Sequence, residues 1–237
     1  MTPRDPSLSS PSAEKHRREL RWWGEELGRY VEWYEGKRRL WDVPPPQGAQ
    51  RSEGNGLPAD AILSWCGAVV DHGPRRLGVP PAHFAGKTIL DLGSGPVPFS
   101  LGFRGCRILA LDPLNAMYLG LGFPLHRYPQ ADRAAYFCAV AERIPLPDGS
   151  VDAIVSFNAL DHFDDLPRAA REIARVLRPR GELRVEVHYH ERPTSLEPWA
   201  LDDLEMQTLF APLGARKLLE TDAEAWGWGE KVTVWGC

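Results

Sequence analysis

The sequence has few cysteines and no long run of apolar residues. Of its 237 residues only four are cysteines, and they are widely separated, at positions 66, 106, 138 and 237. No Cys-x-x-Cys pair is present, so we interpret all four as reduced thiols rather than as a zinc site or a redox disulfide. No apolar stretch approaches the roughly 20 residues of a membrane span, and residues 1–5 are unlike a signal peptide. We therefore expect a cytoplasmic protein with no membrane partner.

An excess of basic charge is also missing. The chain has 28 Lys and Arg against 32 Asp and Glu, which gives a net charge of −4 at pH 7. Domains that bind nucleic acids usually carry a basic excess, so we expect no nucleic-acid partner. The length, with 43% hydrophobic residues, suffices for one well-cored α/β domain and an appendage.

The stretch from Thr88 to Phe99 reads TILDLGSGPVPF and contains the clearest local pattern in the chain. Its apolar beginning predicts a buried parallel strand that runs into a tight turn at Gly93 and Gly95. Without a Cβ these glycines can adopt positive φ and let a ligand lie against bare backbone, next to a helix expected over 97–105. A dinucleotide-type turn would have a third glycine where this chain has Pro98. A purely structural turn remains the alternative.

Asp112 ends the second expected strand, which begins at Arg107. An acid about 20 residues after the first strand is where a ribose-binding carboxylate belongs in such a unit. Its two oxygens can accept hydrogen bonds from both ribose hydroxyls. An acid at a strand end can also be only a helix cap, but the glycine turn at this spacing favours the ribose.

The N-terminal region differs in character from the rest. Residues 1–12 are rich in Pro and Ser and predict a disordered tail. Residues 13–41 predict an amphipathic helix, in which Trp22, Trp33 and Trp41 fall outside a single apolar stripe. This aromatic surplus indicates either plain packing or a lid over a ligand pocket, and we expect residues 13–86 to form a helical cap.

Alternating strand and helix patterns continue to the end of the chain. A helix over 59–71 is expected to stop at His72–Pro74, and a later one to be capped at Asp165. A third helix over 202–210 has a capping pattern between Asp202 and Glu205. Further strands are expected over 135–140, 151–157, 182–189, 215–220 and 231–235.

Four segments in this order resemble the class I S-adenosylmethionine-dependent methyltransferases, in particular the group acting largely on small molecules. They are DLGSG from Asp91, LALDP from Leu109, AERIPLPDGSVDAIVSFNALDH from Ala141 and REIARVLRPRGEL from Arg171. The resemblance covers residues 87–237 as the S-adenosylmethionine-binding domain. It implies an α/β, Rossmann-like three-layer sandwich whose seven-stranded, mostly parallel sheet has an antiparallel last strand, here with an N-terminal helical extension. It also implies methyl transfer from S-adenosyl-L-methionine to an oxygen or nitrogen of a small-molecule acceptor.

The resemblance assigns cofactor-binding roles along the motifs. The methionine end would be lined by Asp91, Gly93, Ser94 and Gly95, the ribose bound by Asp112, the adenine flanked by Pro113, Ala141 and Glu142, and the sulfonium by Asn158 and Ala159. The chain departs from many relatives at Val97, where glycine is common.

Polar and apolar residues alternate along the fifth expected strand. Alternation places on one face the side chains of Glu182, Arg184, Glu186, His188 and His190. Ligands bind at the carboxyl ends of such strands, so a neutral imidazole there could take a proton from the acceptor. We expect His162 to be this base, with His188 second. The alternatives are a structural polar face, or a divalent metal held with Glu186 or Asp161. Because the spacing fits no specific metal pattern, no metal is predicted.

Two other functions remain open on the sequence alone. An NAD(P)-dependent oxidoreductase also uses a glycine turn and a ribose acid, although Pro98 argues against it. A cofactor-binding relative without catalysis would show the same motifs, and only product formation separates it from an enzyme.

Overall fold

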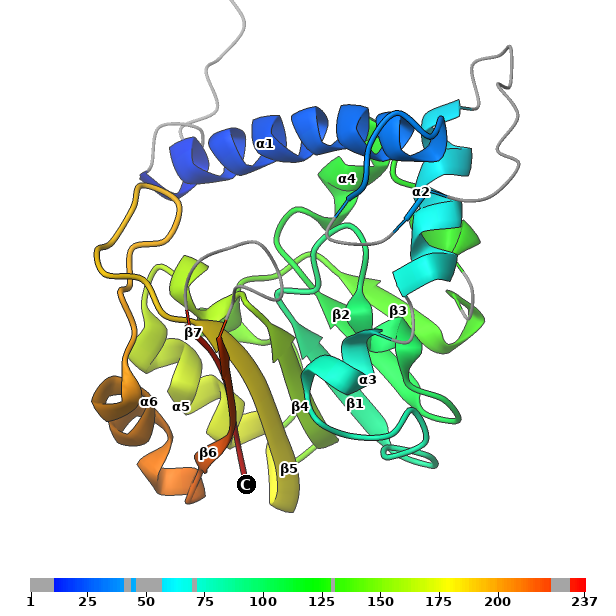
Figure 1. The fold of residues 1–237 in the computed structure, drawn as a ribbon. Coiled ribbons are helices and arrows are strands. Elements are labelled where there is room, and N and C mark those ends of the chain that lie inside the picture. The colour runs from blue at the N-terminus through cyan, green and yellow to red at the C-terminus, as the bar shows by residue number, and fades with distance from the viewer. Residues whose placement is uncertain (1–10, 41–43, 46–56, 70–71, 129–130, 223–230) are drawn as a thin grey trace, which may run out of the picture.

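A computed structural model of the chain describes residues 11–40, 44–45, 57–69, 72–128, 131–222 and 231–237. Its centre is a seven-stranded sheet in the order β3-β2-β1-β4-β5-β7-β6. β7 runs antiparallel to both of its neighbours, β5 and β6, and the other paired strands are parallel (Figure 1). The strands are β1 (Thr88–Leu92), β2 (Arg107–Leu111), β3 (Ala134–Phe137), β4 (Val151–Phe157), β5 (Leu177–His188), β6 (Arg216–Asp222) and β7 (Lys231–Gly236). The expected α/β fold with an antiparallel last strand is confirmed.

Helices cover both faces of the sheet because successive side chains of the buried strands point to opposite sides. Ile89 belongs to one core cluster and Leu90 to the other, and both are fully buried. The first cluster packs α2 (Leu57–Val69), and the second packs α5 (Leu166–Val176). The three-layer sandwich thus follows from continuous apolar strands that need cover on both sides.

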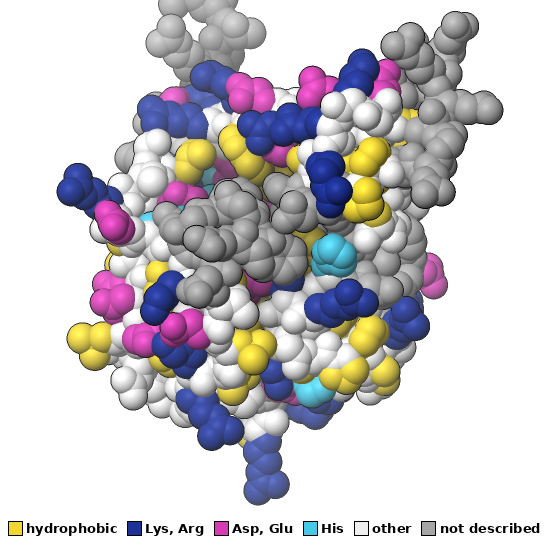
Figure 2. All heavy atoms as spheres, viewed as in Figure 1, with side chains coloured by type: hydrophobic (Ala, Val, Ile, Leu, Met, Phe, Trp, Pro, Cys, Tyr) yellow, Lys and Arg dark blue, Asp and Glu magenta, His cyan; other side chains and the backbone are white. Residues whose placement is uncertain are grey.

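Helix α1 (Pro11–Tyr34) lies along the carboxyl ends of the parallel strands, at the top of Figure 1. It begins inside the tail expected over residues 1–12, and it ends earlier than the expected 41. Gly36 ends it by adopting φ +76°, while its N–H bonds to the carbonyl of Trp33. The rest of the tail and Trp41 lie outside the described residues. Basic and acidic side chains lie next to one another along the top of the space-filling view, where α1 runs (Figure 2). On α1, Glu14 pairs with Arg17 and Arg18.

The helix expected over 97–105 is only the 3₁₀ turn Phe99–Gly102. Pro96 and Pro98 shorten it, because a proline lacks the N–H that an α-helix interior needs. Helix α2 ends at Val69, and residues 70–71 lie outside the described residues, so the end expected at 71 is not described. The expected stop, His72–Pro74, itself begins α3 (His72–Arg76). A Cβ on Gly73 would lie 2.1 Å from the carbonyl oxygen of Phe99, so α3 packs directly on the 3₁₀ turn.

The expected capping residues are confirmed in the second half of the chain. Asp165 accepts the N–H of Arg168 at the start of α5, and Asp202 forms a capping box with Glu205 at the start of α6 (Asp203–Phe210). β5 begins before the expected 182, since its pairing with β4 shifts register after Leu177.

The remaining helices are short. They are α4 (Asn115–Leu121) and the 3₁₀ turns Leu125–Arg127, Ala131–Arg133, Ala141–Arg143, Leu160–His162 and Ala211–Leu213. Among the described residues, no helix has the length and apolarity that crossing a membrane requires.

Candidate active site

The turn after β1 has the backbone that its glycines permit. Gly93 and Gly95 adopt φ +70° and +61°. A Cβ on Gly93 would lie 2.4 Å from the Cβ of Ala159, whereas one on Gly95 would meet only Trp23, at 3.7 Å. Gly93 therefore lets the turn pack against the segment that follows β4, and Gly95 leaves bare backbone below α1.

Asp112 ties the end of β2 to this turn. Its carboxylate accepts the N–H of Gly95 at 3.0 Å and that of Leu114 at 2.8 Å. The residue is 5% exposed and lines the cavity described below. Burial, followed by the nearby charge of Glu19, raises the pKa of Asp112 to about 7. Each carboxylate oxygen can accept a further hydrogen bond, so the group is suited to a pair of ligand hydroxyls.

Three residues assigned to the cofactor lie outside the cavity lining. Asp91 is fully buried behind the turn, where it accepts the hydroxyl of Ser100, and burial raises its pKa to about 7. Ala141 is also buried. Glu142 accepts the backbone N–H groups of Asp164 and Asp165 instead. The structure thus gives Asp91 and Glu142 local structural partners.

A cavity of about 320 Å³ lies between the carboxyl ends of the strands and α1. The expected residues that it brings together are Gly93, Ser94, Gly95, Asp112, Pro113, Asn158, Ala159, His162 and His188. Its other walls include Lys15, His16, Glu19, Trp22 and Trp23 from α1, Trp65 from α2, His72 and Arg76 from α3, and Phe157 and Glu197. Cofactor-type and acceptor-type residues therefore share one space.

Helix α1 forms the roof of this cavity and is fastened at two places. Near its start, the ammonium of Lys15 donates to the carbonyl of His162 at 2.6 Å and pairs with Asp164. Further along, Trp23 packs edge-on against Tyr118 and Phe123, with ring centroids 6.2 and 6.0 Å apart. These contacts hold the aromatic surface of α1 over the strand ends.

The surplus tryptophans of α1 divide between the two expected roles. Trp22 lines the cavity and contacts Trp23 edge-on at 4.6 Å. Trp33 is 1% exposed and packs at right angles against Trp65, 5.1 Å away, while its indole N–H donates to the carbonyl of Pro44. One tryptophan therefore serves the pocket and the other the core.

Partners from α3 satisfy the polar face of β5. Glu186 accepts two hydrogen bonds from the guanidinium of Arg76, one of 2.7 Å, and contacts Nε2 of His188 at 3.2 Å. Burial alone would raise the pKa of Glu186, but the charge of Arg76 and the bond to His188 hold it down to about 2. The buried carboxylate is therefore ionised beside an imidazole that lines the cavity.

The first part of the alternating stretch of β5 is structural. Glu182 pairs with His83 at 2.7 Å and with Arg184 at 2.6 Å, and the guanidinium of Arg184 also donates to the carbonyl of Leu77. None of these groups lines the cavity. The alternation thus has two meanings, a structural network at one end and a ligand site at the other.

Asn158 connects β4 and β5 at the cavity. It has φ +50°, and its side-chain oxygen accepts the N–H of His188 at 3.0 Å. Its own N–H donates to the carbonyl of Glu186. These bonds place the segment after β4 beside His188, where asparagine tolerates a left-handed backbone better than most residues.

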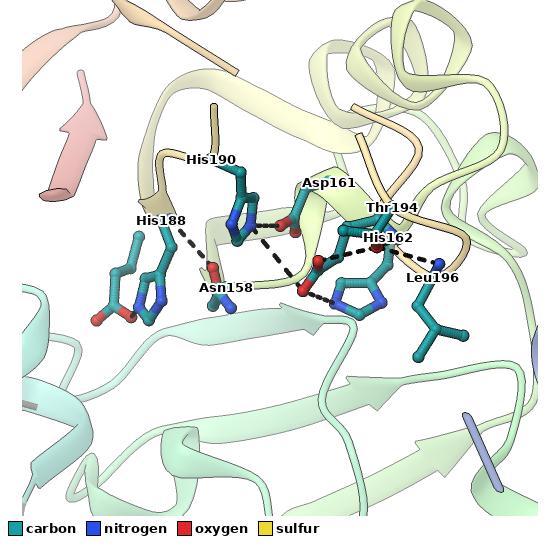
Figure 3. A network of polar contacts seen from close by, with 9 residues as sticks. Asn158, Asp161, His162, His188, His190, Thr194 and Leu196 are labelled. Carbon is teal, nitrogen blue, oxygen red and sulfur yellow. Dashed lines mark hydrogen bonds and ion pairs between the residues drawn. The ribbon is translucent and has the colours of Figure 1, made fainter. Parts of the chain in front are cut away.

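Figure 3 shows the polar network beyond Asn158. His190 contacts the carboxylate of Asp161 at 2.8 Å and that of Glu197 at 3.9 Å, and Nε2 of His162 lies 4.0 Å from Glu197. Of the three histidines expected at the strand ends, His162 and His188 line the cavity, whereas His190 lies outside its lining.

Several lining residues were missed by the sequence analysis, notably Lys15, His16, Glu19, Arg76 and Glu197. Glu197 lies in the segment between β5 and α6 that carries no pattern. Arg76 lies just past an expected helix stop. Lys15 and Glu19 are polar residues of α1 that line the cavity. Hydrophobic periodicity predicts only which side of a helix is apolar, so it does not predict that polar residues of the helix face a cavity. Only the tryptophan surplus pointed to this helix.

Comparison with known proteins relates the central part of the chain to methyltransferases. Residues 90–185 match a family described as a methyltransferase domain. A malonyl-[acyl-carrier protein] O-methyltransferase of Methylococcus capsulatus is 36% identical over 169 residues, which cover 70% of this chain and 50% of that protein. The chain thus spans about half the length of this relative.

Solved structures show the same fold. The [4+2]-cyclase SpnF has a TM-score of 0.59 and 16% identity, with 96% of this chain and 95% of that chain covered. The 1,6-didemethyltoxoflavin-N1-methyltransferase of Burkholderia thailandensis, with 1,6-didemethyltoxoflavin and S-adenosylhomocysteine bound, has a TM-score of 0.50 and 17% identity, with 99% and 92% covered. Residues 90–185 thus belong to a methyltransferase-domain family, and the motifs and the sheet order around them are those of the class I S-adenosylmethionine-dependent methyltransferases.

Proposed function

We propose that this protein transfers the methyl group of S-adenosylmethionine to an oxygen or nitrogen of a small molecule bound beneath α1. One observation carries the proposal: the glycine turn and Asp112 share a single cavity with His188 and with Trp22 and Trp23 of α1. The family match supports methyl transfer over hydride transfer, so the oxidoreductase alternative has no support of its own.

The residues of the strand ends fit the cofactor. Gly95 offers bare backbone with only Trp23 near its missing side chain, and Asp112 has acceptor capacity for ribose hydroxyls. Ser94 and Gly93 would line the methionine end, and Pro113 would flank the adenine. Asn158 and Ala159 would border the sulfonium. We place no cofactor contact at Asp91, Ala141 or Glu142.

The chemistry supplied by bound S-adenosylmethionine is an already activated methyl group on a sulfonium sulfur. The protein's task is then to align the acceptor and exclude water, and near-attack positioning lowers the barrier by several kcal/mol. Trp22 and Trp23 suit this task because they close the cavity with rigid apolar surface. We accordingly assign residues 13–86 the role of a cap over the domain formed by residues 87–237.

A general base is needed only when the acceptor carries a proton at working pH. His162 and His188 both line the cavity. The contacts favour His188, since the ionised Glu186 accepts from its ring and orients it, as a carboxylate orients the histidine of a catalytic dyad. We therefore propose His188 as the base and His162 as the second candidate, which reverses the order expected from the sequence.

Cofactor binding tests the proposal. Calorimetric titration should show that the protein binds S-adenosylmethionine and S-adenosylhomocysteine. Asp112→Ala should lose about 2–4 kcal/mol of that affinity with its charge-assisted hydrogen bonds. Asp132→Ala, at an exposed position, is the matched control. Tight binding of NADH without binding of either sulfur compound would overturn the assignment.

The relative from Methylococcus capsulatus favours a second acceptor class, the carboxylate of a malonyl group on an acyl-carrier protein. A carboxylate is already deprotonated at neutral pH and needs no base. His188→Gln should then leave turnover nearly unchanged with that acceptor but lower it strongly with a phenol or alcohol. Absence of any methylated product, with normal cofactor binding, would indicate a non-catalytic relative.

A further inference from the structure

A histidine and two carboxylates converge beyond the strand ends (Figure 3). Asp161 lies in the 3₁₀ turn after β4, His190 lies two residues past β5, and Glu197 lies in the following segment. One potential ligand atom from each of the three residues lies within 4.8 Å of the other two. Their positions in the sequence are far apart, so only the fold brings the group together.

Asp161 is incompletely satisfied for so buried a group. Its side chain is 1% exposed, and Oδ2 contacts Nε2 of His190 at 2.8 Å. Its other oxygen, Oδ1, has no hydrogen-bond partner among the described residues. Within that part of the chain, neither Asp161 nor Glu197 pairs with a lysine or arginine. A buried carboxylate without full compensation is costly, and a bound cation is one way to supply it.

The spacing of Glu197 fits an ion better than a hydrogen bond. Oε1 lies 3.9 Å from Nε2 of His190 and 4.0 Å from Nε2 of His162, and both distances are too long for hydrogen bonds. Two coordination bonds of about 2.1 Å each can span such a gap. The other oxygen, Oε2, accepts the hydroxyl of Thr194 at 3.0 Å, which fixes the carboxylate in this place.

We propose that Asp161, His190 and Glu197 bind one divalent first-row metal ion of the zinc and manganese class. One imidazole nitrogen with two carboxylate oxygens suits such ions, whereas Mg²⁺ and Ca²⁺ prefer ligand sets made only of oxygen. Such a site would also have an open coordination position, because three protein ligands do not complete the coordination shell of zinc or manganese.

The ion would lie at the wall of the acceptor cavity, because Glu197 and the neighbouring His162 both line it. An acceptor oxygen in the open position would lose its proton at lower pH, which would assist its methylation. This consequence rests on the proposed function. Metal binding itself does not, and it is tested separately.

The experiment begins with chelator-treated, full-length protein titrated with ZnCl₂, MnCl₂ or MgCl₂ alone. Calorimetry and elemental analysis should show one Zn²⁺ or Mn²⁺ per chain, with Mg²⁺ at least about 10-fold weaker. Glu197→Gln retains the shape of the side chain but removes its charge. It should weaken binding of Mn²⁺ about 100-fold or more, since replacing even an outer partner of a metal site costs 10–100-fold.

His83→Gln is the matched control, because His83 also pairs with a carboxylate, that of Glu182 at 2.7 Å, but belongs to no group of three ligands among the described residues. Its Mn²⁺ affinity should equal that of the unaltered protein. Near-UV circular dichroism of each variant verifies folding.

Two results would overturn the site: no stoichiometric binding of Zn²⁺ or Mn²⁺ by the unaltered protein, or equal affinity in Glu197→Gln. Asp161 and His190 would then form only a hydrogen bond between the two loops. Metal binding without methyl transfer would support the metal site but contradict the proposed function. Methyl transfer without metal binding would support the proposed function but contradict the metal site.

Discussion

The two ends of the cavity are built in different ways. At the cofactor end, Gly93, Gly95 and Asp112 come from one strand-turn-strand unit, in which Gly93 donates its N–H to the carbonyl of Leu111 and Gly95 donates its N–H to the carboxylate of Asp112. At the acceptor end, Glu186 is held by Arg76, a residue 110 positions earlier, and α1 is fastened to a carbonyl 147 positions away. The cofactor end is therefore local in sequence, whereas the acceptor end beside it depends on contacts between distant parts of the chain.

The largest expected effect separates two tryptophans of α1. Trp33→Ala should lower the free energy of unfolding by about 3–5 kcal/mol, because it leaves a void against Trp65. Trp22→Ala should change it by less than about 1 kcal/mol, because that side chain faces the cavity and is only half-buried. Its effect should appear in turnover instead. Chemical denaturation measures the free energy of unfolding, and initial rates measure turnover. Equal losses of stability in the two variants would contradict the assignment of Trp33 to the core and Trp22 to the cavity.

At the cofactor end, Gly93→Ala should cost about 2–4 kcal/mol of stability. The new Cβ would lie 2.4 Å from that of Ala159, at a positive φ that L-residues avoid. Cofactor affinity should fall with it, as calorimetry can measure. Gly24→Ala is the control, since no atom lies within 4 Å of its added Cβ and alanine favours the helix. A fully stable Gly93→Ala would show that the turn can move away from β4.

At the acceptor end, His188→Gln should lower turnover roughly 100-fold with an acceptor that must lose a proton. Cofactor affinity should be unchanged, which separates a base from a residue that only shapes the site. His126→Gln, at an exposed position, controls for the loss of an imidazole. An unchanged rate for His188→Gln and a lowered one for His162→Gln would restore the order expected from the sequence.

The most gradual effect is a pH response of opposite sign at the two ends, which is spread over several pH units. The raised pKa of Asp91, about 7, means that the folded state holds a proton that the unfolded chain releases near pH 4. Its contribution to stability is therefore lost as the pH rises from about 4 through 7. The lowered pKa of Glu186, about 2, gives a contribution that is present above the unfolded value and lost as the pH falls toward 2. Each group changes the free energy of unfolding by at most about 1.4 kcal/mol per pH unit.

Denaturation of Asp91→Asn and Glu186→Gln over pH 3–8 measures these contributions. In Asp91→Asn the free energy of unfolding should fall less steeply toward high pH. In Glu186→Gln it should fall less steeply toward low pH. Identical pH profiles for the two variants would mean that both carboxylates have the same environment, contrary to the structure.

Much of the cofactor end could be predicted because it depends on short-range rules. A β-branched run followed by glycines predicts a strand and turn, and an acid at the end of the next strand predicts the position of Asp112. The capping patterns at Asp165 and Asp202 were readable for the same reason, since a cap depends on neighbours three residues away. The helix expected over 97–105 was wrong in length, because Pro96 and Pro98 limit this segment to a short 3₁₀ turn.

Short-range rules did not suffice to predict the acceptor end of the cavity. Alternation along β5 predicted that polar groups share a face, but it did not distinguish the structural pair of Glu182 and His83 from the cavity pair of Glu186 and His188. The difference comes from which helix covers each end of the strand. Arg76 decides it, and its helix lies in a stretch where the sequence predicts a stop.

The sequence by itself thus determined the order of most elements, the need of the central strands for cover on both faces and the residues of the glycine turn, since each depends on local propensity or on continuous apolar runs. The reversed last strand was implied only by the resemblance to known methyltransferases. Only the tertiary structure decided that Trp22 lines a cavity while Trp33 fills the core, and that Asp161, His190 and Glu197 meet. Those outcomes depend on how α1 and the segment after β5 pack across the strand ends. The residues that make these contacts lie far apart in the sequence, so no local spacing pattern predicts them.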